Sequence, residues 1–141
     1  MTHQLTALLD TLLPGDGADW PAAGAHGLAA RTTALASGVP NGAEALAAVL
    51  AALPTAFDTF AQPQREDVLR RIEAEESARF VAVITATYNA YYTDPAIRDI
   101  IERMTGYPNR PPQPEGYDLD PFDESLLDAV KARGPIWRSV D

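Results

Sequence analysis

The chain has 141 residues, 46% of them hydrophobic, and its 20 acidic against 11 basic residues give a formal net charge of −9 at pH 7. This length and apolar content suit one globular domain, and the acidic balance disfavours nucleic acid or an anionic membrane as a partner. Cysteine is absent, which excludes disulfides, thiol catalysis and thiolate-bound metal.

The sequence contains no stretch that approaches the roughly 18 apolar residues of a membrane-spanning helix. The N-terminal segment also lacks the basic region and the twin arginines of an export signal. We therefore expect a cytoplasmic protein without membrane insertion, or a periplasmic one only if it is exported with a partner.

The first predicted helix spans residues 2–13, where leucines recur at three- and four-residue spacing. Pro14 and Gly15 end it. The turn that follows contains Asp16 and Asp19, which could bind an ion, although a loop without a ligand is the simpler interpretation. No strand precedes this turn and no Lys-Ser/Thr follows it, so it is not a phosphate-binding loop.

Two helices rich in small residues are predicted next. Pro21 suits the first position of a helix that runs to Gly38. Asn41 then predicts an N-cap, with Glu44 reaching back to complete a capping box, for an apolar helix that ends at Pro54. Their alanine and glycine content lets other backbones approach closely, so we interpret both helices as core packing.

Pro63 opens the next predicted helix, whose inward stripe meets Glu75 and Glu76 before it resumes at Phe80. Two helices that meet near Ala74 account for this interruption. One long helix with a buried functional carboxylate is the alternative. The exposed face predicts three ion pairs at i,i+4 spacing, which are Glu66–Arg70, Asp67–Arg71 and Glu75–Arg79.

Residues 80–92 are apolar nearly all round, which is typical of a helix in the middle of a domain or against another protein. A new helix is predicted directly afterwards, because Asp94 suits the N-cap and Pro95 the first helical position. Gly106 fits the left-handed position that ends it.

Residues 107–121 contain five prolines, which favour extended backbone. Asp120 and Pro121 then predict the start of a last short helix. We divide the chain into a helical core domain, 1–107, and an arm, helix and tail, 108–141. The expected fold is all-α: a small domain of about five to six helices with a proline-rich extended C-terminal arm.

The pattern of reactive side chains predicts no catalytic, cofactor-binding or metal-binding residue. His3 and His26 have no second ligand at helical spacing, so a zinc site is not expected. Tyr88, Tyr91 and Tyr92 suit stacking on a sugar or cofactor, but this spacing is more typical of a core or an interface. An acidic cluster fits no EF-hand loop, and helix capping explains part of it more simply; its members are Glu115, Asp118, Asp120, Asp123 and Glu124.

Three segments of the chain, taken together, resemble a known family. They are LTALLDTLLPGDG, LPTAFDTFAQPQREDVLRRIE and TATYNAYYTDPAIRDIIERMTGYPNRPPQPEGYDL, of which YYTDP and GYP are the most recognisable parts. In order and spacing they are similar to the gluconate 2-dehydrogenase subunit 3 family, the small helical subunits of flavin-dependent dehydrogenases of the glucose-methanol-choline type.

The resemblance implies an accessory role. A large catalytic subunit would carry FAD and the catalytic residues, and this chain, with no cofactor of its own, would support its folding, stability or assembly. Many members also bring a twin-arginine export signal, which this sequence lacks. The substrate would be a sugar or related alcohol, and the family name does not specify gluconate.

The apolar helix, the proline-rich arm and a terminal tryptophan are features that a subunit bound to a larger protein would need. The alternative is a free-standing helical binding module, as a monomer or a homodimer. A third interpretation has Arg110 or Tyr107 closing the substrate pocket of the partner. The residues that we expect at the partner interface are Tyr91, Tyr92, Tyr107, Pro108, Arg110, Tyr117 and Trp137.

Overall fold

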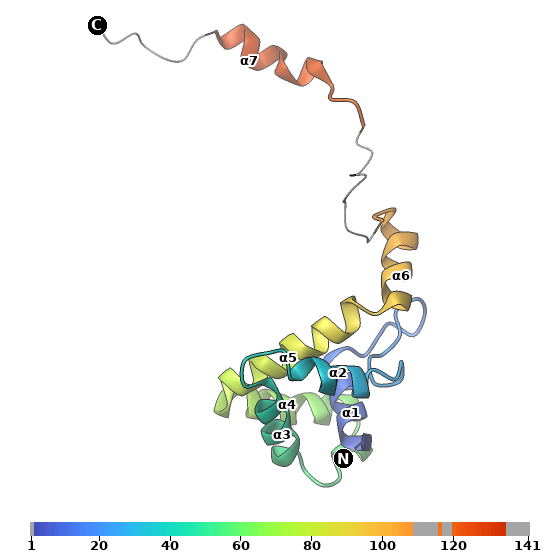
Figure 1. Ribbon diagram of the computed structural model, residues 1–141, viewed down its shortest axis with the longest axis vertical. Helices are drawn as coiled ribbons and strands as arrows, with labels where there is room; N and C mark the ends of the chain where they lie inside the picture. The colour runs from blue at the N-terminus through green and yellow to red at the C-terminus, as the bar shows by residue number, and fades with distance from the viewer. Residues whose placement is uncertain (1, 109–115, 117–119, 135–141) are drawn as a thin grey trace, which may run out of the picture. The chain divides into compact units, whose positions relative to one another are not determined.

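The computed structural model describes residues 2–108, 116 and 120–134 (Figure 1). Within these residues the chain forms seven α-helices and two short 3₁₀-helices, and no strand. The predicted all-α fold is therefore confirmed. The chain divides into two compact units, unit 1 (Met1–Asn109) and unit 2 (Arg110–Asp141).

Unit 1 contains six of the α-helices. Their bounds are α1 (Thr2–Leu12), α2 (Ala29–Ala36), α3 (Gly42–Ala52), α4 (Gln62–Glu75), α5 (Ser77–Tyr92) and α6 (Pro95–Thr105), with the 3₁₀-helix η1 (Phe57–Thr59) between α3 and α4. Unit 2 contains the 3₁₀-helix η2 (Glu124–Leu127) and α7 (Asp128–Arg133).

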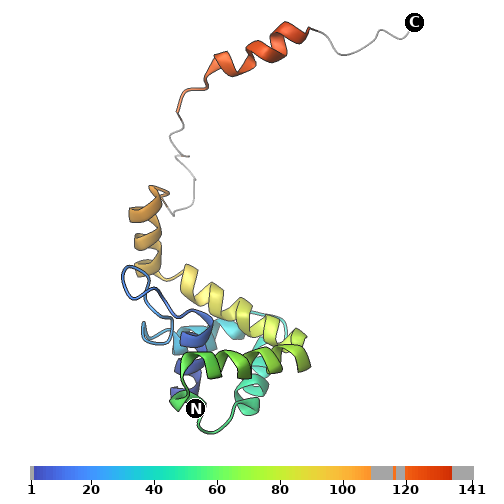
Figure 2. The same cartoon turned by 180° about the vertical axis from the view of Figure 1, so that it is seen from behind.

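Helix α5 is the centre of unit 1, and α2, α3 and α4 pack against it. Figures 1 and 2 show it as the long helix that crosses the bundle. Ala82, Ala86 and Ala90 recur every four residues along one side of α5, and all three are buried. Small side chains at this spacing let neighbouring helices approach closely, so the apolar run predicted from the sequence is core on this side.

The second helix begins eight residues later than predicted. Residues 21–28 are not helical, with turns over residues 23–28, and α2 starts only at Ala29. The reason lies in two glycines. Gly27 adopts a φ of +85°, which is not helical, and Gly24 lies so close to α1 that a Cβ would stand 2.2 Å from the carbonyl oxygen of Thr6.

The predicted capping box at α3 is wrong. Asn41 has a φ of 57° and a ψ of 12°, and its side chain makes no capping hydrogen bond. A capping side chain requires extended backbone at its own residue, which the left-handed conformation does not provide. Glu44 is exposed, and its carboxylate lies 3.9 Å from the Arg79 guanidinium instead.

Helices α4 and α5 are separate, as predicted from the interrupted stripe. The break falls at Glu76, whose φ of −131° and ψ of 41° are not helical. Both Glu75 and Glu76 are exposed, so the alternative of a buried functional carboxylate is wrong. The break also changes the predicted ion pairs: Arg79 pairs with Glu76 rather than with Glu75.

The ion pairs on α4 agree only in part with the prediction. Arg70 pairs with Glu66 at 3.0 Å, as expected from i,i+4 spacing. The same guanidinium also reaches Asp67 at 2.6 Å, and the predicted Asp67–Arg71 pair does not form. Arg70 thus forms ion pairs with both carboxylates.

Unit 2 also begins its helical turn later than predicted. The 3₁₀-helix η2 starts at Glu124, and Asp123, not Asp120, caps it by accepting a hydrogen bond of 2.9 Å from the Ser125 N–H. The Ser125 hydroxyl and that N–H bond lower the pKa of Asp123 below its usual value. Within the predicted acidic cluster, Asp123 therefore has a capping role, whereas Asp120 is exposed and does not cap η2.

Candidate functional site

The loop between α1 and α2, residues 13–28 and hereafter the α1–α2 loop, is held in shape by its own polar groups. One carboxylate oxygen of Asp16 accepts hydrogen bonds of 2.9 Å from the N–H groups of Ala18 and Trp20. These two bonds lower the pKa of Asp16 below its usual value. The carboxylate that the sequence offered as an ion ligand is therefore used to build the loop.

The α1–α2 loop is also fixed to α1. The Ala25 N–H donates to a carboxylate oxygen of Asp10 at 2.9 Å, and the Ala23 N–H donates to the Leu13 carbonyl oxygen at 3.0 Å. The first bond joins the loop to α1, and the second closes the loop on its own first residue. The loop is therefore a fixed surface against which other elements can pack.

The junction of α5 and α6 rests on this loop. Tyr91, near the end of α5, is 3% exposed, and its hydroxyl donates to the Pro21 carbonyl oxygen at 2.8 Å. Burial raises the pKa of the Tyr91 phenol, and neighbouring Tyr92 and Asp16 raise it further. The expectation that Tyr91 contacts a partner is corrected here, because its ring belongs to the core.

Thr93 and Asp94 also face the loop and α2. The Arg31 guanidinium donates to the Thr93 carbonyl oxygen at 3.2 Å and to its hydroxyl oxygen at 2.8 Å. Nε2 of His26 lies 3.0 Å from Oδ1 of Asp94. Asp94 also accepts from the Ala96 N–H at 3.1 Å, so its predicted role as the N-cap of α6 is confirmed.

The outward side of the same junction is aromatic. Tyr88 and Tyr92 are 45% and 46% exposed, and their ring centroids lie 5.9 Å apart in an edge-to-face arrangement. We call these two residues the aromatic edge. Beyond α6, Tyr107 is also about half exposed and Pro108 is partly buried. Tyr92 and Tyr107 thus remain accessible, as a partner contact requires.

Three of the predicted interface residues cannot be placed. Arg110, Tyr117 and Trp137 lie outside the described residues, and so do Glu115 and Asp118 of the predicted acidic cluster.

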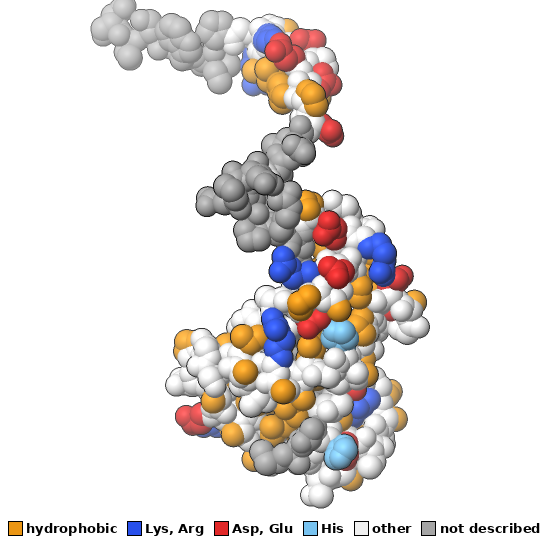
Figure 3. Space-filling model, turned by 45° about the vertical axis from the view of Figure 1, so that its right-hand side comes forward, with side chains coloured by type: hydrophobic (Ala, Val, Ile, Leu, Met, Phe, Trp, Pro, Cys, Tyr) orange, Lys and Arg blue, Asp and Glu red, His pale blue; other side chains and the backbone are white. Residues whose placement is uncertain are grey.

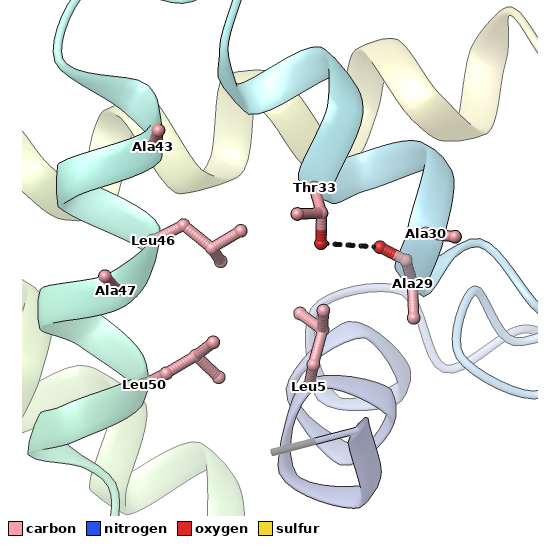
Figure 4. A pocket seen from close by; sticks show the side chains of 8 residues that line it. All are labelled: Leu5, Ala29, Ala30, Thr33, Ala43, Leu46, Ala47 and Leu50. Carbon is pink, nitrogen blue, oxygen red and sulfur yellow. Dashed lines mark hydrogen bonds between the residues drawn. The ribbon is translucent and has the colours of Figure 1, made fainter.

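Sequence reasoning missed an apolar groove between α2 and α3 (Figure 4). Its volume is about 370 Å³, and its lining contains no charged residue. Figure 4 shows Leu46 and Leu50 of α3 facing α2, with Leu5 of α1 between the two helices. The Thr33 hydroxyl donates a hydrogen bond of 2.9 Å to the Ala29 carbonyl oxygen, so its proton is already bonded within α2.

The signal for this groove was the scarcity of charge. Residues 20–57 contain only two charged side chains, Arg31 and Glu44. Figure 3 shows charged groups of both signs near the α6 end of unit 1, while hydrophobic and uncharged surface predominates farther down the same face. The sequence predicts core packing for both alanine-rich helices, and the structure shows that each also lines this open groove.

Unit 2 presents a second apolar surface. Phe122, Leu126 and Val130 are 64%, 69% and 59% exposed, and Leu127 is 38% exposed. Neither η2 nor α7 has a buried residue. We call these four residues the unit 2 apolar face.

The part of the chain that the structure describes contains no group of three or more histidine, cysteine or acidic side chains arranged to hold a metal ion. None of its helices is both long enough and apolar enough to span a bilayer.

Comparisons of the chain with protein-family models, with curated proteins and with solved structures give no match.

Proposed function

We propose that this chain is the non-catalytic small subunit of a heteromeric FAD-dependent oxidoreductase that acts on a sugar or related alcohol. In this proposal a large flavin-dependent subunit carries FAD and the catalytic residues. The small subunit supports the folding, stability or assembly of that partner.

The observation that carries the proposal is the position of two segments that resemble the small-subunit family. The segment LLPGDG leads into the α1–α2 loop, and YYTDP joins α5 to α6, more than seventy residues later in the chain. Tyr91 and Asp94 of YYTDP bind Pro21 and His26, which lie in the same loop a few residues beyond LLPGDG. The resemblance thus falls on elements that pack together in the fold.

The same junction supports a docking role, because some residues of YYTDP hold the junction together while another remains exposed. Tyr91, Thr93 and Asp94 hold the junction together, while Tyr92 points outward beside Tyr88. Exposed tyrosines are frequent anchors of protein interfaces, since they combine a large apolar ring with a hydroxyl that can bond to water or partner.

The unit 2 apolar face is the second proposed contact. Val130 of this face lies in the six-residue helix α7, and Phe122, Leu126 and Leu127 lie in or just before η2. Helical segments this short are not stable alone in water, and these four side chains are exposed. A large partner would supply the surface that covers them, as expected for helix recognition in a groove.

The test is purification of the full-length tagged chain from its native cells. A large protein in fixed stoichiometry should accompany it, release FAD on denaturation, and oxidise a sugar or related alcohol with an artificial electron acceptor. Replacement of both Tyr92 and Tyr107 by alanine should lower recovery of the flavoprotein at least about tenfold, because such anchors contribute more than about 1 kcal/mol each.

The matched control replaces Asp58 and Arg71, which are exposed polar residues of unit 1, by alanine. This control should retain the flavoprotein. Recovery of the chain without any flavoprotein would contradict the proposed partner. Equal recovery of the flavoprotein with both double variants would contradict the proposed contact through Tyr92 and Tyr107.

A second candidate function rests on the groove between α2 and α3. Its volume of about 370 Å³ and its apolar lining fall in the range of small-ligand sites. A free-standing binding module would purify as a colourless oligomer or monomer. Leu50→Arg would then abolish binding of an apolar probe, whereas the flavoprotein subunit would keep its partner with this change.

A further inference from the structure

Helix α6 is attached to unit 1 by little apolar surface. Among its residues only Ile97 is buried, and Ile100 and Ile101 are partly buried against the core. Helix α5, by comparison, contains seven buried residues. Since apolar burial provides most of the stability of a helix in a protein, α6 depends more on its polar contacts than α5 does.

Polar contacts reach the α5–α6 junction and α6 itself from the α1–α2 loop and α2. The Asp19–Arg103 pair is short, 2.8 Å, but its side chains are 53% and 60% exposed. Exposed pairs contribute little to stability and are screened by salt. His26 and Asp94 are 26% and 18% exposed, so their 3.0 Å contact is screened less.

We propose that the His26–Asp94 contact is an acid-sensitive latch that holds the start of α6 against the α1–α2 loop. When the latch opens, α6 loosens as a unit while α1–α5 stay packed. Because α6 is the last helix of unit 1, the latch controls how firmly the segment that follows Gly106 is anchored.

The charge on Asp94 explains why acid would open the latch. Desolvation raises the pKa of Asp94, but the hydrogen bond from His26 and those from the Ala96 and Ile97 N–H groups outweigh it and hold the pKa below the usual 3.8. The contribution of this carboxylate is therefore complete above pH 3.8 and is lost as the pH falls through its lower value in the folded protein.

Other titratable or charged groups lie on the elements that meet at this junction. They are Asp16 and Asp19 of the loop, Arg31 of α2, Arg79, Tyr88, Tyr91 and Tyr92 of α5, and Arg98, Asp99, Glu102 and Arg103 of α6. Arg31 bonds to Thr93 and Arg103 to Asp19, so these two cations are already engaged beside the latch.

The experiment is amide hydrogen exchange on the full chain near neutral pH, with α5 as the internal reference. Asp94→Asn removes the charge but keeps a good N-cap, so it separates the latch from helix capping. Amides of α6 should exchange roughly tenfold faster, the factor expected for a lost hydrogen bond to a charged group, while those of α3 and α5 do not change.

His26→Ala should produce the same local acceleration, and the double variant should exchange no faster than the faster single variant, because both changes remove one contact. Asp19→Asn is the matched control. It removes the exposed ion pair between Asp19 and Arg103 of α6, and it should accelerate amide exchange in α6 less than about threefold.

Amide exchange measured as the pH falls gives a second, independent test of the latch. As the pH falls below 3.8, protection of α6 relative to α5 should decrease in the wild type, and this relative decrease should be absent from Asp94→Asn. Equal acceleration of all six helices in the variants, unchanged α6 exchange in both single variants, or an acid response that persists in Asp94→Asn would overturn the proposal.

Discussion

At the scale of single residues, close approach between backbones decides what the chain tolerates. Gly24 shows this most directly. It is buried where the α1–α2 loop crosses α1, and a Cβ there would lie 2.2 Å from the Thr6 carbonyl oxygen and 2.9 Å from the Asp10 carboxylate. That carboxylate accepts the Ala25 N–H, so any shift of the loop also disturbs an anchoring hydrogen bond.

We predict that Gly24→Ala destabilises unit 1 by about 2–3 kcal/mol, because the backbone must move to accommodate the methyl group. Gly38→Ala is the matched control. Its Cβ would meet nothing closer than the Leu35 carbonyl oxygen at 3.4 Å, and its φ is not positive. The control should change stability by less than about 1 kcal/mol, and in the favourable direction if at all.

Chemical denaturation monitored by circular dichroism measures both variants. Equal midpoints for the two alanine variants would show that the loop does not pack on α1 as described.

At the scale of elements, the helices begin and end where backbone conformation requires it. Gly106 ends α6 with a φ of 70° and bonds back to the Glu102 carbonyl oxygen at 2.8 Å, as its residue type predicted. The start of α3 differs, because Asn41 reverses the chain in the left-handed region instead of capping with its side chain. Asparagine tolerates that region better than most residues.

The residue at position 41 therefore matters through its backbone. Asn41→Ala should destabilise unit 1 by about 1 kcal/mol, because alanine lacks the short polar side chain that lets asparagine tolerate positive φ. Asn41→Gly should be neutral or slightly stabilising, since glycine adopts this conformation freely. If Asn41 capped α3 with its side chain, glycine would instead destabilise unit 1 by a few tenths of a kcal/mol and alanine by about 1 kcal/mol. The sign of the Asn41→Gly effect in thermal unfolding therefore distinguishes the two patterns.

At the scale of the whole molecule, the two units differ in how they bury apolar side chains. Unit 1 contains the entire described core, with Leu8, Leu9, Phe57 and Ile97 fully buried. The described helices of unit 2 contain no buried residue. A segment of this kind gains its stability from what it binds, which agrees with the proposed role of the unit 2 apolar face.

A chain that ends at residue 109 should consequently fold on its own. We expect its thermal midpoint to lie within about 3 °C of the full chain, a difference well under 1 kcal/mol for a domain of this size. The truncated chain should also fail to retain the flavoprotein, because it lacks the unit 2 apolar face. Calorimetry and co-purification measure the two effects separately.

A large loss of thermal stability on truncation would show that unit 1 needs residues 110–141 to fold. Full retention of the flavoprotein would remove the unit 2 apolar face from the proposed interface while leaving the aromatic edge as a contact.

The sequence by itself determined the all-α class, the break between α4 and α5, the start of α6 at Asp94 and Pro95, and its end at Gly106. These features depend on neighbours within a few residues, because caps, prolines and left-handed glycines act on the local backbone. The same local rules failed at Pro21 and Asn41, where a close approach to α1 and a reversed chain, respectively, prevailed over residue preference.

Only the tertiary structure decided which tyrosine faces inward and where the groove opens. Tyr88, Tyr91 and Tyr92 look equivalent in the sequence, but the carbonyl oxygen of Pro21 accepts the hydroxyl of Tyr91 alone. The reason is that side-chain burial on a helix depends on which distant segment packs against each face. The α1–α2 loop covers Tyr91 and leaves the aromatic edge exposed, and no local pattern encodes that contact.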